Sequence, residues 1–176
     1  EAFTIAQNGR PGPVLIDIPK DVQFAKGSYV EKNKIVIPSH RLFEPNPNFE
    51  KTKIDEAVEI ISKSKKPIFY IGGGCINSGP KASKLVREFI DLVGSPVTMT
   101  LMGLGVVASS DKNSLGMLGM HGMYEANMAM HECDVMINIG ARFDDRVTGR
   151  LDAFSPNSKK IHVDIDASNI NKTINV

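Results

Sequence analysis

Hydrophobic residues recur along the chain with two periods, one typical of helices and one typical of buried strands. Residues 53–64 and 80–93 carry apolar side chains every three or four positions, and a third helix is predicted late in the stretch 116–133. Between these helices lie short, mostly apolar runs of the kind that form strands buried on both faces of a sheet. The runs read PIFYI, PVTMTL, DVMINIG and KKIHVDID.

This alternation of strands and helices predicts the fold class. Strands that are separated by helices pair in parallel, because each helix carries the chain back across the sheet. We therefore expect an α/β fold, a parallel sheet flanked by helices on both faces. The carboxyl ends of such strands meet at one edge, where ligands of open α/β sheets bind.

The first fifty residues follow another pattern. The stretch GRPGPVLIDIPKDVQ predicts a turn, a short strand at Val14–Ile18 and a stop at the proline that follows. From 24 to 51 no periodicity is visible and prolines keep the chain extended, which is the composition of a linker. We therefore predict the end of one domain in residues 1–23, a linker in 24–51 and a second domain in 52–176, incomplete at its carboxyl end. The chain opens without a methionine, so we expect a piece of a longer polypeptide.

Composition narrows the classes of function. The net charge of the 176-residue chain is +1, so neither nucleic acid nor an anionic membrane surface is a predicted partner. The longest apolar stretch, around residues 96–108, is too short and too rich in glycine to span a bilayer. The two cysteines, Cys75 and Cys133, stand in no metal-binding or redox spacing, and we expect two buried free thiols.

Glycine-rich stretches accompany the predicted strands. GGGCINSG, from Gly72, stands where a dinucleotide fingerprint would, but Asn77 replaces its third glycine and the next strand ends without an acidic residue. Two interpretations stay open: a tight turn, or a turn that lets a ligand approach the backbone closely. TLMGLG and LGMHGM are further glycine-rich turns at the same predicted edge.

Charged residues gather directly after the run DVMINIG. The segment 142–146 contains two arginines and two aspartates, which form either a mutually neutralised surface loop or a clamp for phosphate or carboxylate. Asp164, near the end of the last predicted strand, can bind a ribose hydroxyl. Together these features favour an adenine dinucleotide extended across the sheet edge. No set of acid, base and nucleophile is visible, so the residues support binding better than catalysis.

Six segments in this order resemble the large catalytic subunits of acetolactate synthases, also named acetohydroxyacid synthases, within the thiamine-diphosphate-dependent enzymes. The segments are GRPGPVLIDIPKDVQ, YIGGGCINSG, TLMGLG, LGMHGMYEAN, IGARFDDRVTG and KKIHVDID. The resemblance covers essentially the whole chain, and its most specific parts are the first segment and RFDDRVTG. It implies that residues 1–23 end a pyrimidine-binding domain and that residues 52–176 form most of a Rossmann-like central domain that binds FAD.

The resemblance also implies a function for the full-length subunit. Such enzymes decarboxylate pyruvate and condense the two-carbon unit with a second 2-keto acid, pyruvate or 2-ketobutyrate, in branched-chain amino-acid biosynthesis. They use thiamine diphosphate, Mg²⁺ and FAD. The first two are expected to bind outside this segment, which alone is expected to be inactive. A homo-oligomer, dimer or tetramer, with a regulatory small subunit is implied, in the bacterial cytoplasm or in a plastid or mitochondrion.

Carried over motif by motif, the resemblance assigns ligand-binding residues but no catalytic residue and no metal ligand to this segment. Lys20, Asp145 and Arg146 are expected to line the substrate channel, with Arg146 meeting the carboxylate of the second keto acid. FAD contacts are expected at Arg10, Gly73, Thr100, Leu101, Leu118, Gly119, Met120, His121, Gly140, Ala141, Arg142, Phe143, Asp144, Asp164 and Ile165.

Three alternatives stay open. One is another FAD-containing thiamine-diphosphate enzyme, of the pyruvate oxidase or glyoxylate carboligase type, which the string RFDDRVTG disfavours. The second is a nucleotide-binding module without catalytic activity. The third is an NAD-dependent dehydrogenase, which Asn77 in the glycine-rich turn makes a weaker candidate.

Overall fold

The computed structural model describes residues 1–29 and 51–176. The chain forms two compact units, residues 1–49 and 50–176, and each is described by itself. Most of the predicted linker, residues 30–50, lies outside the described residues.

Within residues 1–29, the described part of the first unit, the chain forms two short helices, α1 (Ala2–Gln7) and α2 (Lys20–Phe24). The strand predicted at Val14–Ile18 is wrong: within residues 1–29 the structure has no strand, and none of these residues is buried. An apolar run becomes a strand only when its backbone groups pair with a neighbouring strand. Since residues 1–29 offer no such neighbour, Leu15 stays 88% exposed.

The second unit is built on a five-stranded sheet in which every neighbouring pair is parallel, as predicted. Its strands lie in the order β3-β2-β1-β4-β5. The chain therefore runs outward from the centre through β2 to β3 and returns to the other side of β1 for β4 and β5. The strands are β1 (Pro67–Ile71), β2 (Val97–Met99), β3 (Ser114–Met117), β4 (Val135–Ile139) and β5 (Lys159–Val163).

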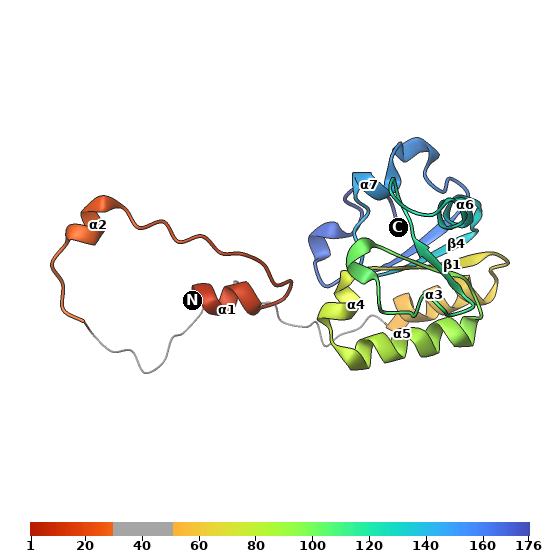
Figure 1. Cartoon of the computed structure of the whole chain (residues 1–176), viewed down its shortest axis with the longest axis horizontal. Helices are drawn as coiled ribbons and strands as arrows, with labels where there is room; N and C mark the ends of the chain where they lie inside the picture. The colour runs from red at the N-terminus through yellow and green to blue at the C-terminus, as the bar shows by residue number, and fades with distance from the viewer. Residues whose placement is uncertain (30–50) are drawn as a thin grey trace. The chain divides into compact units, whose positions relative to one another are not determined.

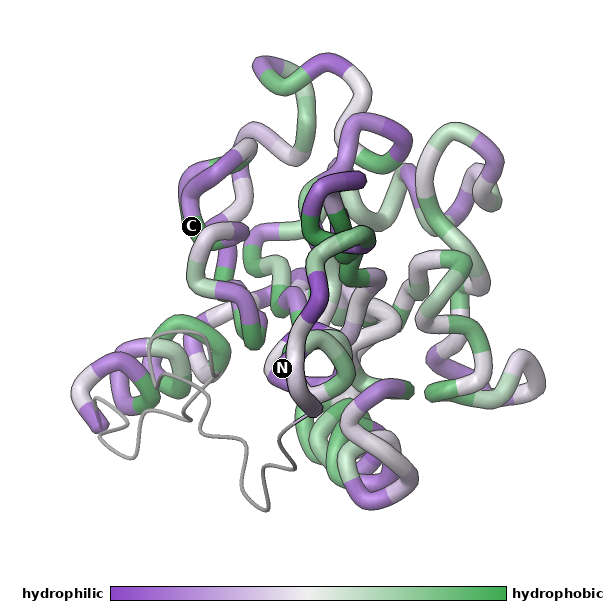
Figure 2. Tube along the Cα trace, turned by 90° about the vertical axis from the view of Figure 1, so that its left-hand side faces the viewer, coloured by the Kyte–Doolittle hydropathy of each residue, from purple (hydrophilic) through white to green (hydrophobic). Residues whose placement is uncertain are grey.

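Helices cover both faces of this sheet (Figure 1). One apolar core lies between the sheet and the pair α3 (Lys51–Ser62) and α5 (Pro80–Val93), and the other lies beneath α6 (Tyr124–Glu132). Alternate residues of the strands point to the two cores, as the period of two in a strand requires. In Figure 2 the helices carry hydrophobic residues on one side and hydrophilic residues on the other.

Three local features differ from the sequence predictions. The strand predicted in PVTMTL ends early, at Met99, because the Thr100 side chain accepts the Gly103 N–H and starts the 3₁₀ turn η2 (Leu101–Gly103). The glycine-rich stretch after β1 forms a short helix, α4 (Gly73–Asn77), rather than a turn. Strand β3 was not predicted, because its four residues include Gly116 and it pairs only with β2.

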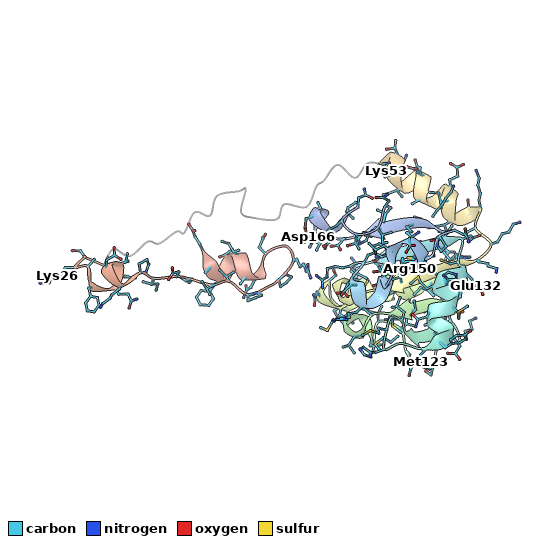
Figure 3. All side chains as sticks on the ribbon, turned by 90° about the horizontal axis from the view of Figure 1, so that it is seen from above. Lys26, Lys53, Met123, Glu132, Arg150 and Asp166 are labelled. Carbon is cyan, nitrogen blue, oxygen red and sulfur yellow. The ribbon has the colours of Figure 1, made fainter. Side chains whose placement is uncertain are left out.

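The parallel arrangement brings the loops that follow all five strands to one edge, which we call the carboxyl edge. The opposite end of the sheet is the amino edge. Figure 3 shows the two ends through Asp166, just after β5, and Glu132, just before β4. In the described ranges, no helix combines the length and apolarity needed to cross a membrane.

Candidate ligand-binding site

β1 and β4 are the neighbouring strands at which the chain crosses from one half of the sheet to the other. The loops that follow these two strands pack backbone against backbone. Gly72 and Gly74 donate N–H groups to the carbonyl oxygens of Ile139 and Gly140, at 2.9 and 3.0 Å. A Cβ atom on Gly72 would lie 2.1 Å from the Gly140 carbonyl oxygen, so no larger residue fits there. Gly140 itself has φ +67°, the left-handed region that glycine prefers. The glycine pattern is thus explained first by this close approach of two loops at the carboxyl edge.

Two buried polar side chains, Asn138 and Tyr70, hold the loop after β4 through hydrogen bonds to its backbone. The amide of Asn138, which is fully buried, accepts the Ala141 N–H at 3.2 Å and donates to the Ala141 carbonyl at 3.0 Å. The Tyr70 hydroxyl donates to the Arg142 carbonyl at 2.9 Å. Phe143 is buried against Tyr70, with ring centroids 5.9 Å apart. The loop therefore presents Arg142 outward on a rigid base.

The charged segment after this loop divides into a paired part and an unpaired part. Arg142 Nη2 lies 3.3 Å from Asp144 Oδ2, so these two side chains neutralise each other. Asp144 also caps the short helix α7 (Asp145–Thr148), because its Oδ1 accepts the Arg146 N–H at 2.9 Å. The Arg146 guanidinium and the Asp145 carboxylate are exposed and have no ion pair with the part of the chain that the structure describes. They are therefore available to a ligand.

The loop after β3 lies beside this charged segment, although β3 and β4 are on opposite sides of β1. The Met120 N–H donates to the Arg146 carbonyl at 2.8 Å. Gly119, with φ +94°, is held by Asn127 of α6, whose Oδ1 accepts its N–H at 2.8 Å and whose Nδ2 donates to its carbonyl at 2.9 Å. The structure thus brings together two sets of predicted ligand contacts that come from separate loops.

The acidic residue at the end of β5 stabilises its own turn. Asp164 Oδ1 accepts the Asp166 N–H at 2.8 Å, and its Oδ2 accepts from the Asn169 side chain at 3.1 Å. The buried His162 places its Nε2 3.5 Å from Asp164 Oδ2 and 2.9 Å from the Ala141 carbonyl oxygen. With only 7% of its side chain exposed, Asp164 has little surface left for a ribose hydroxyl.

The second unit contains both cysteines of the chain, Cys75 and Cys133. Burial raises the pKa of Cys75 to about 11 and raises the pKa of Cys133, so both thiols stay protonated at neutral pH. Both are free and buried, as predicted. Among the described residues no group of three or more His, Cys, Asp or Glu could hold a metal ion.

The predicted contacts fall into three classes of accessibility. Leu101, Met120, His121, Arg142, Asp145, Arg146 and Ile165 expose their side chains, and Gly73, Thr100, Gly140 and Asp144 are half-buried. The side chains of Leu118, Ala141 and Phe143 are buried, so these residues and the buried Gly119 can meet a ligand only through the backbone. Arg10 and Lys20 belong to the first unit and are exposed.

Four polar residues that organise the edge were missed by sequence reasoning: Tyr70, Asn127, Asn138 and His162. Asn138 gave a signal, because an amide in the middle of the apolar run VMINI requires a buried partner. Asn127 gave none, since a single asparagine in a helix is commonly exposed to solvent.

A groove of about 860 Å³ lies away from this site, at the amino edge, between α3 and the ends of α5 and α6. Its walls are mostly apolar, with Ile61, Phe89 and Val93 among them. None of the predicted ligand contacts lines it. The convergence of loops at the carboxyl edge is the stronger indication of a functional site.

Comparison with known proteins assigns this arrangement to a family. The family described as "Thiamine pyrophosphate enzyme, central domain" matches residues 54–176. The chain is 49% identical over 174 residues to the acetolactate synthase large subunit of Porphyra purpurea, covering 98% of this chain and 29% of that protein. It is 45% identical over 176 residues to the acetolactate synthase large subunit of Haemophilus influenzae, covering 100% and 30%. It is also 45% identical over 172 residues to "Acetolactate synthase, chloroplastic" of Arabidopsis thaliana, covering 98% and 25%. The chain therefore spans less than a third of each of these relatives.

Proposed function

Since the chain belongs to the thiamine pyrophosphate enzymes, with residues 54–176 matching their central domain, we propose that it is part of an acetolactate synthase large subunit. The full-length protein would decarboxylate pyruvate and join the two-carbon unit to a second 2-keto acid, pyruvate or 2-ketobutyrate. This reaction serves branched-chain amino-acid biosynthesis. The observation that carries the proposal is the 45–49% identity to acetolactate synthases over nearly the whole chain.

In this proposal the carboxyl edge of the second unit binds FAD. The fit rests on two observations: exposed apolar side chains at Leu101 and Met120, and the exposed guanidinium of Arg142. An apolar side chain suits the flat face of a ring system, and a guanidinium suits a diphosphate. Asp164 fits less well as a direct contact, because its carboxylate already accepts hydrogen bonds from the Asp166 N–H and the Asn169 side chain.

The exposure of each side chain decides whether the other proposed contacts would meet FAD through the side chain or through the backbone. Buried side chains would leave only the backbone of Leu118, Gly119, Ala141 and Phe143 to the cofactor. The remaining proposed contacts are Arg10, Gly73, Thr100, His121, Gly140, Asp144 and Ile165. FAD would be structural in the main reaction, so this segment would bind and orient the cofactor.

Arg146 and Asp145 are the proposed substrate contacts of the second unit. The planar guanidinium of Arg146 can bind a carboxylate through two parallel hydrogen bonds, which would favour a 2-keto acid over an aldehyde as acceptor. Its main chain is held at both ends, by Asp144 and by Met120, while the side chain stays exposed. Lys20, at the start of α2 in the first unit, is the third proposed substrate contact.

Thiamine diphosphate and Mg²⁺ are proposed to bind elsewhere in the full-length subunit. Thiamine diphosphate supplies the chemistry of decarboxylation and carbon–carbon bond formation. The segment described here would be inactive alone. We further propose a homo-oligomer, dimer or tetramer, with a regulatory small subunit, in the bacterial cytoplasm or in a plastid or mitochondrion.

The test uses the full-length protein supplied with thiamine diphosphate, Mg²⁺ and FAD. Formation of 2-acetolactate from pyruvate, and of 2-aceto-2-hydroxybutyrate when 2-ketobutyrate is added, supports the proposal. A flavin absorption spectrum in the purified protein supports the assignment of FAD. If neither 2-acetolactate nor 2-aceto-2-hydroxybutyrate forms, the proposed activity is overturned. Hydrogen peroxide produced from pyruvate and oxygen would indicate a pyruvate oxidase, and consumption of glyoxylate a carboligase of the other type.

A further inference from the structure

Asn127 of α6 is hydrogen-bonded to Gly119, and the next residue of the same loop is hydrogen-bonded to Arg146. We propose that Asn127 is a positioning residue that fixes Arg146 through the loop after β3. This inference rests on the proposed role of Arg146 as the contact for the acceptor carboxylate. It adds a residue on a separate helix, 19 positions earlier in the chain, to the machinery that holds the acceptor.

Asn127 and Gly119 are joined by a pair of hydrogen bonds. The amide of Asn127 uses both of its polar atoms on a single peptide position, accepting from the Gly119 N–H at 2.8 Å and donating to its carbonyl at 2.9 Å. Such a pair fixes the orientation of the backbone as well as its distance. Gly119, with a φ of +94°, has no side chain to restrict its backbone, so these two hydrogen bonds supply the restriction.

The loop that contains Gly119 also contacts α7. The residue after Gly119 donates its N–H to the Arg146 carbonyl at 2.8 Å. A Cβ atom on Gly119 would lie 2.8 Å from the same carbonyl oxygen, so the two backbones are in direct contact there. A loop that is fixed at Gly119 therefore fixes the position of the Arg146 main chain.

Helix α7 depends on contacts with its surroundings. This helix has four residues, Asp145–Thr148, too few to be stable without outside contacts. The Asp144 side chain holds its beginning by accepting the Arg146 N–H at 2.9 Å. The Met120 N–H holds the Arg146 carbonyl. Because Asn127 orders the loop that supplies this second contact, the direction in which Arg146 presents its guanidinium depends on Asn127.

The first arm of the test measures amide hydrogen exchange in the full-length protein and does not depend on any activity. Asn127→Leu removes both hydrogen bonds at similar size, and Asn127→Asp keeps the acceptor but removes the donor. We expect exchange of peptides covering 117–123 and 144–149 to be about tenfold faster in Asn127→Leu, and less accelerated in Asn127→Asp. Glu125→Gln, an exposed change on the same helix, is the control and should match the wild type.

The second arm measures the KM for the acceptor 2-keto acid, which we expect to rise about tenfold in Asn127→Leu with little change in kcat. Faster exchange at 117–123 with wild-type exchange at 144–149 would overturn the proposed coupling between the loop after β3 and Arg146. A wild-type KM for the acceptor in Asn127→Leu would overturn it as well.

If Asn127→Leu fails to fold, Asn127→Asp decides by the same measurements. Acceleration spread over peptides of β1 and β4 would mean a general structural role and would also overturn the inference. A wild-type protein that forms no acetolactate would overturn the proposed function alone, because the exchange arm still tests the coupling.

Discussion

At the scale of single residues, one buried amide, one half-buried amide and one buried hydroxyl decide how the charged loop is presented. Asn138 and Asn127 each hold the backbone of one residue through two hydrogen bonds. Tyr70 donates to the Arg142 carbonyl in the loop after β4. A buried polar group that lost its partner would cost about 1–3 kcal/mol, so these contacts restrict the loop strongly. The residues that face outward, such as Arg146, are consequently positioned by residues that no ligand touches.

The side chain of Arg146 gives the first prediction. In the full-length protein Arg146→Ala should raise the KM for the acceptor keto acid about 10- to 100-fold, because a charge-assisted hydrogen-bond pair to its carboxylate is lost. FAD retention should stay unchanged, since the Arg146 carbonyl that binds the Met120 N–H remains. Steady-state kinetics and the flavin spectrum measure the two effects.

The matched control for Arg146 is Arg150→Ala, which removes an exposed arginine whose Nε lies 2.8 Å from Asp152 Oδ1. Its kinetics should resemble those of the wild type, because exposed ion pairs contribute little. Loss of FAD in Arg146→Ala with an unchanged acceptor KM would contradict the assigned role.

Tyr70 gives the second prediction. Tyr70→Phe should lower the free energy of unfolding by about 1–2 kcal/mol at pH 7, because the Arg142 carbonyl loses its buried donor. Burial, and to a smaller extent the charge of Asp144, raises the pKa of Tyr70 well above its ordinary value. The folded protein thus keeps the phenolic proton at a pH where the unfolded chain releases it, so this contribution is present below about pH 10 and is lost as the pH rises further.

Urea unfolding between neutral pH and pH 11 measures this dependence. The difference in stability between the wild type and Tyr70→Phe should narrow above about pH 10. Tyr124→Phe, at a side chain that is 73% exposed, serves as the control and should follow the wild type throughout. A difference that stays constant with pH would show that the buried hydroxyl is not the cause.

At the scale of elements, the junction between the β1 and β4 loops is the feature that the strand order creates. These strands are sequentially distant but adjacent in the sheet, and their loops meet through the backbone of Gly72, Gly74 and Gly140. Close backbone contact of this kind leaves no room for side chains and fixes the spacing of the loops. The same junction carries α4 on one side and the charged segment on the other.

Gly140 gives the third prediction. A Cβ atom there would lie 2.9 Å from Gly74 Cα and 3.0 Å from the Cys75 nitrogen, and φ is +67°. Gly140→Ala should therefore lower the free energy of unfolding by roughly 3 kcal/mol or more, from backbone strain and from the forced separation of two loops. Gly94→Ala is the control, because Gly94 has φ +70° with open space around its Cβ position.

In Gly94→Ala only the backbone strain remains, so we expect the free energy of unfolding to fall by about 1 kcal/mol. Thermal or urea unfolding of both variants measures the difference. Equal losses in the two variants would mean that the junction adjusts to a methyl group without cost.

At the scale of the whole molecule, the two units have unequal cores. The second unit encloses its sheet between two apolar cores, whereas residues 1–29 bury no residue. A segment that buries little apolar surface cannot offset the conformational entropy lost on folding. The second unit therefore carries the stability of the described structure.

This difference gives the fourth prediction. Residues 51–176 produced alone should fold cooperatively, with a free energy of unfolding of about 5–10 kcal/mol, because a sheet covered on both faces buries enough apolar surface. A peptide of residues 1–29 should show no stable helix, since α1 and α2 have six and five residues. Far-ultraviolet circular dichroism during urea titration measures both. A broad transition without a folded baseline for 51–176 would contradict the prediction.

The sequence by itself determined the main elements of the second unit and the edge at which its ligand loops gather. Helical spacing located α3, α5 and α6 to within a few residues, and apolar runs located four of the five strands. Parallel pairing followed from their alternation, because a helix between two strands returns the chain to the same end of the sheet. The sequence also placed the glycine turns and the charged segment at that edge.

Only the tertiary structure decided which of these loops touch and which residues hold them. The apolar run Val14–Ile18 has the composition of a strand but no pairing partner in residues 1–29, so it is not one. The bond from Met120 to Arg146, and the support that Asn127 gives to Gly119, join segments that no local pattern connects. Local periodicity reports which face of an element is buried, whereas contacts between loops depend on the order of the strands, which is set by the packing of the whole sheet.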